Sequence, residues 1–144
     1  MNKDSKDVLV KIPAGAHVAV IDGSRFVLFR NGSDAVHADL GSPKHPDLDP
    51  TNRSQGKLRH SITTNQEAGN DLDEAAHVAA AADWLNHAVL TNVIDDLIIV
   101  ADKRSLGELR RHYHKELQDR LRLELGKAMT NMPATDIAEA IASA

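Results

Sequence analysis

The stretch LIIVADKRSLGELRRHYHKEL, residues 97–117, decides the fold that we predict. Residues 97–101 are a continuous apolar run with the length of a strand that is buried in the middle of a sheet. Ser105 and Glu108 then have the spacing of a capping box, in which the serine caps a helix and the glutamate reaches back to it. The stretch therefore predicts a buried strand that leads into an amphipathic helix. The apolar positions of that helix are Leu106, Leu109, Tyr113 and Leu117.

Three segments upstream of this stretch have the alternation or the residue types of β-strands. AHVAVIDG (residues 16–23) alternates and ends in Asp-Gly, and RFVLFR (25–30) is followed by Asn-Gly. Both dipeptides favour tight hairpin turns. AVHADL (35–40) alternates again. The three segments therefore predict an antiparallel meander.

Residues 41–70 hold three of the five prolines and little periodic apolar sequence. A loop of this length is unusual inside a small domain, so we expect it to be mobile or to serve a function. From Asp71 the sequence becomes rich in alanine and predicts a helix. The apolar face of this helix consists of Ala75, Val78, Ala82, Leu85 and Val89.

RLRLELGK (residues 120–127) repeats leucine at every second position, which is the period of a strand, although its residues also favour helices. As a strand it would place its three leucines on one buried side, and Arg120 and Arg122 on the other. Pro133 then opens a last helix. The apolar residues of this helix are Ala134, Ile137, Ala138 and Ile141.

The predicted fold class is α/β, with a mixed sheet in a single domain: a three-stranded meander followed by helix, strand, helix, strand and helix. Residues 1–11 are expected to be an N-terminal tail, and residues 12–144 the domain, with its long loop at 41–70. The expected core residues are Val18, Val20, Phe26, Leu28, Ile98, Ile99, Leu109 and Tyr113.

The composition excludes several classes of protein. The chain contains no cysteine, so disulfides and thiol chemistry are excluded. The first residues lack the apolar segment of an export signal, and no apolar run approaches the ~20 residues that cross a membrane. We therefore expect a cytoplasmic protein with no membrane partner; the sequence leaves its oligomeric state open.

The charge is unevenly distributed. Residues 103–127 carry eight basic and four acidic residues, net +4, whereas the whole chain has a net charge of −4. A helix start with basic residues nearby can bind a phosphate, but a solvated basic face explains the same pattern. With only four aromatic residues in the chain, any contact with RNA would be to its backbone. The candidate residues for binding nucleic acid or phosphate are Lys103, Arg104, Ser105, Arg110, Arg111, His114, Arg120 and Arg122.

No sequence motif indicates catalysis, a cofactor or a metal ion. The glycines stand singly and form no phosphate-binding loop. His112 and His114 are two residues apart, which in a helix places them on nearly opposite sides. Asp73 and His77 have a better spacing, but two ligands do not make a metal site. We therefore predict no catalytic residue and no metal site. A hydrolase or nuclease would depend only on histidines such as His60 and His112.

Three segments resemble the bacterial host attachment protein family: residues 12–32, 98–117 and 129–141. The most specific parts are the LGELR block that starts at Leu106, and the corner Thr130-Asn131-x-Pro133. That family is related to the middle domain of the archaeo-eukaryotic peptide release factors and of Pelota. The resemblance implies their order of strands and helices, which is RNase H-like, and it supports a strand at 120–127.

The resemblance also implies a function in translation. In the release factors, a loop before the first long helix carries the Gly-Gly-Gln that triggers peptide release, whereas residues 54–70 here read SQGKLRHSITTNQEAGN. We therefore expect a non-enzymatic, release-factor-like domain that docks on RNA or on the translation machinery, with the ribosome or tRNA as partner. The alternative is a protein-interaction module associated with attachment to hosts.

Overall fold

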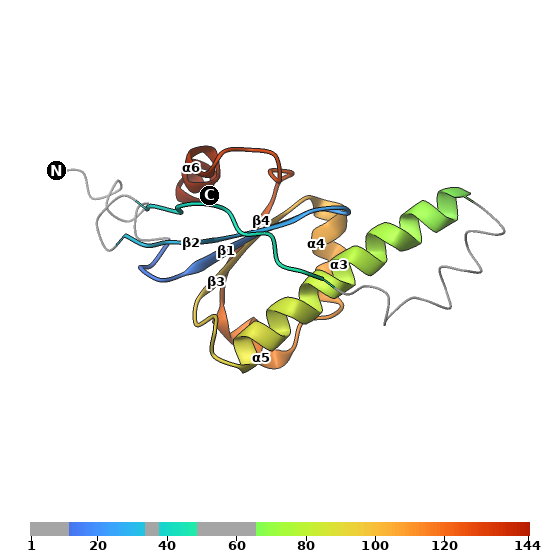
Figure 1. Cartoon of the computed structure of the whole chain (residues 1–144), viewed down its shortest axis with the longest axis horizontal. Helices are drawn as coiled ribbons and strands as arrows, with labels where there is room; N and C mark the ends of the chain where they lie inside the picture. The colour runs from blue at the N-terminus through green and yellow to red at the C-terminus, as the bar shows by residue number, and fades with distance from the viewer. Residues whose placement is uncertain (1–11, 34–37, 49–65) are drawn as a thin grey trace.

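The computed structural model describes residues 12–33, 38–48 and 66–144. It contains one four-stranded mixed sheet with helices on both faces (Figure 1). Its elements are, in chain order, β1 (His17–Ile21), β2 (Phe26–Arg30), α3 (Gln66–Leu90), β3 (Leu97–Ala101), α4 (Lys103–Arg110), α5 (Lys115–Arg120), β4 (Leu121–Gly126) and α6 (Ala134–Ser143). The strand order is β2-β1-β3-β4, and only β2 is antiparallel to its neighbour. The predicted α/β class with a mixed sheet is confirmed.

The first predicted hairpin is present, and the side chain of Asp22 fixes its turn. Asp22 Oδ1 accepts hydrogen bonds from the backbone N–H groups of Ser24 at 2.8 Å and Arg25 at 2.7 Å. β1 and β2 then pair in antiparallel register from His17↔Arg30 to Ile21↔Phe26. The hairpin is predicted from the positive φ that an Asp-Gly turn uses, but Gly23 does not have a positive φ. The side chain of Asp22 closes the turn instead.

The prediction of a second hairpin, which would join residues 25–30 to residues 35–40, is wrong for the residues that the structure describes. Residues 38–40 form no strand, and residues 34–37 lie outside the described part of the chain. The buried side chain of Asn31 donates to the carbonyl of Ile12 at 3.0 Å and accepts from the backbone N–H of Asp39, also at 3.0 Å. These long-range contacts hold the chain in a wider loop than a two-residue turn. On the side of β2 that faces away from β1, Leu28 instead pairs with Lys44 in a single antiparallel bridge.

The sheet separates two apolar cores. Helices α3, α4 and α5 cover one face, and α6 covers the other (Figure 1). β1 shows the alternation of a strand that is buried on both sides, since Ala19 and Ile21 face the first core and Val18 and Val20 the second. Seven of the eight expected core residues are buried; the exception is Tyr113, which is half-buried. Its hydroxyl donates to Glu124 Oε2 at 2.8 Å, and this keeps one end of the ring at the surface.

The stretch 97–117 forms the predicted strand, followed by two helices rather than one. All residues of β3 are fully buried. The predicted capping box is wrong: the residue that caps α4 is Asp102, whose Oδ2 accepts from the backbone N–H of Ser105 at 3.1 Å. Ser105 itself is buried inside the first turn. Because Asp102 follows directly after β3 and caps the helix, α4 begins at Lys103, earlier than a cap at Ser105 would allow.

A break at residues 111–114 separates α4 from α5. The side chain of Asn86, on α3, donates to the carbonyl of His112 at 2.8 Å and accepts from the backbone N–H of His114 at 2.9 Å. His114 Nδ1 accepts from the backbone N–H of Glu116 at 3.1 Å and so caps α5. Backbone groups that the break leaves without helical partners are thus satisfied by side chains.

The predicted strand at 120–127 is present as β4, but its leucines do not share one face. Leu97 pairs with Leu121, whereas the next residue, Ile98, pairs with Leu123, so β4 bulges at Arg122. Leu121 therefore packs against the core under α3, α4 and α5, and Leu123 packs against the core under α6. The leucines of β4 are only partly buried because β4 is an edge strand.

The long connection before α3 is also shorter than predicted. The helix begins at Gln66, five residues before the expected Asp71. Residues 41–48 are irregular apart from the bridge at Lys44, and residues 49–65 of the predicted loop lie outside the described part of the chain.

Candidate functional site

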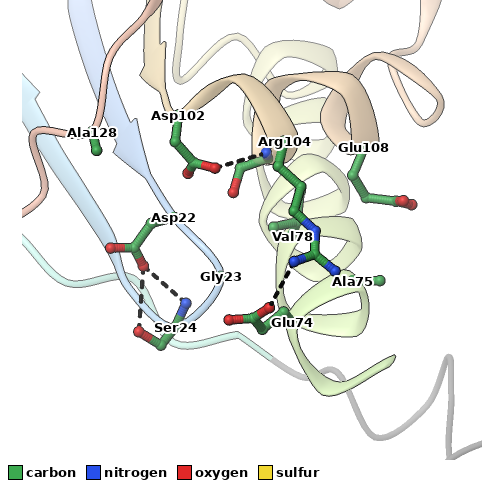
Figure 2. A pocket seen from close by; sticks show the side chains of 11 residues that line it. Asp22, Gly23, Ser24, Glu74, Ala75, Val78, Asp102, Arg104, Glu108 and Ala128 are labelled. Atoms are coloured by element: carbon green, nitrogen blue, oxygen red, sulfur yellow. Dashed lines mark hydrogen bonds and ion pairs between the residues drawn. The ribbon is translucent and has the colours of Figure 1, made fainter. Parts of the chain in front are cut away.

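A hollow of about 440 Å³ lies where the parallel strands β1, β3 and β4 end (Figure 2). Ligands of open α/β sheets bind at this edge, because loops and helix starts converge there. We call it the carboxylate hollow, since four of its lining residues are acidic. The described residues that line it are Asp22, Gly23, Ser24, Glu74, Ala75, Val78, Asp102, Arg104, Ser105, Glu108 and Ala128.

Asp22 is the most firmly held of the four acids. Besides the two turn N–H groups, its carboxylate accepts a hydrogen bond from the hydroxyl of Thr130. Burial alone would raise the pKa of Asp22, but these hydrogen bonds, led by that of Thr130, together outweigh it and lower the pKa. His77 Nδ1 lies 3.0 Å from the carbonyl oxygen of Asp22. Because a carbonyl oxygen only accepts, His77 donates here, and burial lowers its pKa.

The other three acids are Glu74 on α3, Asp102 at the N-cap of α4 and Glu108 towards the end of α4. Asp102 Oδ2 accepts from Ser105, while Asp102 Oδ1 is buried and has no hydrogen-bond partner among the described residues. Glu74 faces Arg104 at 3.8 Å, with both side chains more than half exposed (Figure 2). Glu108 Oε2 lies 2.8 Å from His112 Nε2. Four carboxylates against one arginine favour a cation or a polar group over a phosphate.

The described residues contain no group of three histidine, cysteine or acidic side chains placed to hold a metal ion. Asp73 and His77 are both on α3, and His77 turns to the hairpin of Asp22. His112 is bonded to Glu108, and His114 caps α5. These contacts give the three histidines structural roles. His60 lies outside the described residues.

The residues of the predicted basic stripe lie on four consecutive segments rather than at one point. Lys103, Arg104, Ser105 and Arg110 are on α4, Arg111 and His114 in the link that follows, Arg120 at the end of α5, and Arg122 on β4. Only Arg104 and Ser105 line the carboxylate hollow. Of the others, Arg110 contacts Glu124 on β4, whereas Arg120 and Arg122 contact the turn before β3, at the opposite end of that strand from the hollow.

Each arginine of the stripe has an acidic neighbour. Arg110 donates to Glu124 Oε1 from two nitrogens, at 2.8 and 3.1 Å. Arg111 lies 3.6 Å from Glu108, and Arg122 lies 2.8 Å from Asp96. Arg120 lies 3.0 Å from Asp95 and 3.8 Å from Glu116. Asp95 and Asp96 come from the turn before β3, so the stripe is less positive in space than it is in sequence.

Sequence reasoning missed Asp22 and Asp102 as members of one site. Each directly follows the last residue of a buried strand, at Ile21 and at Ala101. β1 and β3 are parallel neighbours, so both acids are brought to the same edge. The signal was present in the sequence, but the predicted meander did not establish that these two strands are adjacent.

The fold and the hollow define a class: a single mixed-sheet α/β domain with polar side chains at the carboxyl ends of its parallel strands. The sequence model of the bacterial archaeo-eukaryotic release factor family 12 matches residues 16–141. The chain therefore belongs to this family, and its predicted relationship to the release factors is confirmed. A search of curated proteins found none that matches. None of the described helices has the length and apolar character needed to cross a membrane.

Proposed function

We propose that this chain is a non-enzymatic, release-factor-like domain that docks on RNA of the translation machinery, in the cytoplasm. The observation that carries the proposal is the combination of family membership with exposed basic side chains on α4 and in the link after it. The partner would be ribosomal RNA or tRNA, and the contacts would be made to phosphates.

The exposure of the arginines on α4 and in the link after it supports contacts with phosphates. The side chains of Arg104, Arg110 and Arg111 are 70%, 57% and 75% exposed. Ion pairs of side chains this exposed add little stability, so an arginine can exchange its carboxylate for a phosphate. Lys103 is also exposed, and nothing acidic on α4 lies within the first turn.

The docking surface that we infer is the outside of α4 and the link, rather than the carboxylate hollow. A phosphate in the hollow would meet Asp22, Glu74 and Asp102, and Asp102 already takes the helix N–H of Ser105. Arg120 and Arg122 are held against Asp95 and Asp96 and would contribute less.

Peptide release by Gly-Gly-Gln is not part of the proposal. No two glycines are adjacent anywhere in the sequence, so the motif cannot be formed. We infer no catalytic residue for this domain, because the three histidines discussed above are each engaged by the fold.

The test is binding of unfractionated tRNA, and sedimentation with ribosomes, at several salt concentrations. Wild-type protein should bind at low salt, with affinity falling as salt rises, because counterions are released from phosphates. The double substitution Lys103→Gln with Arg111→Gln should weaken binding and lower the slope of log affinity against log salt by about one per lost phosphate contact.

The matched control is Arg30→Gln with Lys44→Gln, which removes the same charge at the opposite edge of the sheet, where β2 lies. It should bind like wild type. Absence of binding at low salt, or equal weakening by both doubles, would contradict the proposal. Capture of envelope proteins that survives nuclease treatment would instead favour the alternative, a module associated with attachment to hosts.

A further inference from the structure

A second hollow, of about 500 Å³, lies beside the edge strand β2 and is independent of the docking surface above. We call it the β2-edge hollow. It lies between β2, the segment that runs past it at residues 40–46, and the end of α3 with the turn that follows. The described residues that line it are His17, Leu28, Phe29, Arg30, Leu40, Gly41, Ser42, Lys44, His45, Pro46, Trp84 and Val93.

Strand register places its polar groups on one side of the sheet. His17 is paired with Arg30, and Leu28 with Lys44, while Leu28 and Arg30 are two residues apart on β2. Paired residues, and residues two apart, share a face. Leu28 belongs to the core under α3, so His17, Arg30 and Lys44 are on the face where Trp84 packs.

The apolar part of the hollow is already formed. The ring of Trp84 is held edge-on against Phe26, with 5.5 Å between the ring centroids and 82° between the planes. Val93 is 60% exposed at the rim, so its apolar side chain is available to a ligand there. A fixed aromatic wall beside an unpaired apolar rim is the setting of a small-molecule site.

The charged part of the hollow has a single sign. Arg30 and Lys44 are its cations, His17 and His45 add two imidazoles, and no carboxylate occurs among the described lining residues. This contrasts with a chain whose net charge is −4. His17 Nδ1 is also buried and has no hydrogen-bond partner in the described structure. Buried polar atoms in native proteins are nearly always paired, so this one points to a missing hydrogen-bond partner.

We propose that the β2-edge hollow binds a small organic anion with a flat apolar body, its acidic head between Arg30, Lys44 and His17 and its body against Trp84 and Val93. The class is that of aromatic carboxylates, sulfonates and phosphate monoesters. A volume of about 500 Å³ is within the range of ~300–1,000 Å³ found for such ligands.

The chain offers a built-in reporter, because Trp84 is its single tryptophan. The probe is anilinonaphthalene sulfonate, an apolar aromatic anion, titrated into the native full-length protein. The matched neutral probe is phenylnaphthylamine, which has the same body without the sulfonate. Saturable binding with one site, accompanied by energy transfer from Trp84, is the expected result for the anion.

Removal of the cations should affect only the charged probe. Arg30→Gln with Lys44→Gln should weaken binding of the sulfonate at least roughly tenfold, and leave the neutral probe unchanged. Lys103→Gln with Arg111→Gln removes the same charge on α4 and should bind both probes like wild type. Circular dichroism confirms that each variant is folded.

Val93→Glu provides a second variant that places an acidic group at the exposed rim and should also weaken sulfonate binding. Failure to see saturable transfer from Trp84 would overturn the proposal. So would an unchanged sulfonate affinity in the Arg30 and Lys44 double, or an equal loss with both charge doubles. Because the RNA assay uses α4 and this one uses the β2 edge, either result can fail while the other stands.

Discussion

The carboxylate hollow and the β2-edge hollow have similar volumes and opposite charge. The carboxylate hollow lies at the carboxyl ends of the parallel strands and is lined by four acids and one arginine. The β2-edge hollow lies at the other end of β1, where His17 begins the strand, and its described lining has cations but no acids. The difference shows that one small fold can carry sites of opposite charge, so the chemistry of each site has to be argued from its own residues.

The acids of the first hollow are largely occupied by the fold itself. Asp22 fixes the hairpin and bonds Thr130, and Asp102 starts α4. The cations of the second hollow differ, because neither Arg30 nor Lys44 forms a salt bridge with a carboxylate among the residues that the structure describes. Groups that the fold does not use are the better candidates for a ligand.

The largest effect should come from Leu109, which is fully buried on α4 behind the carboxylate hollow. Leu109→Ala should lower the free energy of unfolding by roughly 2–5 kcal/mol, because it leaves a cavity. Chemical denaturation measures this, with Leu90→Ala, at a side chain 50% exposed, as the control. If the hollows are independent, sulfonate binding at the β2 edge stays unchanged under native conditions. A loss below ~0.5 kcal/mol would contradict the packing described for α4.

A smaller effect is expected at Gly23, where the hairpin of the carboxylate hollow touches α3. A Cβ at this position would lie 2.9 Å from Glu74 Cγ and 3.0 Å from Glu74 Cβ. Gly23→Ala should therefore destabilise the protein by roughly 1–3 kcal/mol, the range for overpacking. Thermal unfolding checks this prediction.

The matched glycine is Gly107, inside α4, where an added Cβ would meet nothing within 4 Å. Gly107→Ala should stabilise the domain by roughly 0.5–1 kcal/mol, because alanine favours a helix more than glycine does. Equal effects at the two glycines would mean that the close approach of Gly23 to α3 is not real.

Local patterns predicted much of the fold. β1, β2, β3 and β4 were each indicated by apolar runs or alternation, and α6 by Pro133 and the spacing of its apolar residues. The errors arose where two local solutions compete. Both Asp102 and Ser105 are good helix caps, and only the packed structure shows that the aspartate caps α4.

Other features depend on partners that are distant in sequence. The bulge at Arg122 is visible only in the pairing of β4 with β3. The loop after β2 depends on Asn31, which reaches back to Ile12. The β2-edge hollow combines His17, Lys44 and Trp84 from three separate segments. No motif links such residues, so neither hollow could be assembled from the sequence.

The acid dependence of stability offers a further contrast between the hollows. The folded-state pKa of Asp22 is lowered below its ordinary value of 3.8. The ionised carboxylate therefore contributes to the free energy of unfolding above pH 3.8, and this contribution is lost as pH falls below that value. Asp22→Asn keeps a turn acceptor but removes this titration. The free energy of unfolding, measured with denaturant at several pH values between 5 and ~2, should fall less steeply with pH for the variant than for wild type. Parallel curves would mean that Asp22 titrates alike in both states.

The smallest effect concerns His17, one of the two imidazoles of the β2-edge hollow. Burial lowers its pKa below 6.5, and the nearby charges of Arg30 and Lys44 lower it further, while Asp95 acts in the opposite direction. Folded His17 therefore releases its proton at lower pH than unfolded His17, and the stability that this neutral form provides is lost as pH falls below 6.5. Titration of the His17 ring by NMR should show the lowered pKa. Arg30→Gln with Lys44→Gln should raise the pKa of His17, because two repelling charges are removed. Saturation with the sulfonate probe should also raise it, because the probe brings an opposite charge. Lys103→Gln with Arg111→Gln should leave it in place. A His17 pKa that responds equally to both doubles would show that it senses the net charge of the protein rather than the cations of its own hollow.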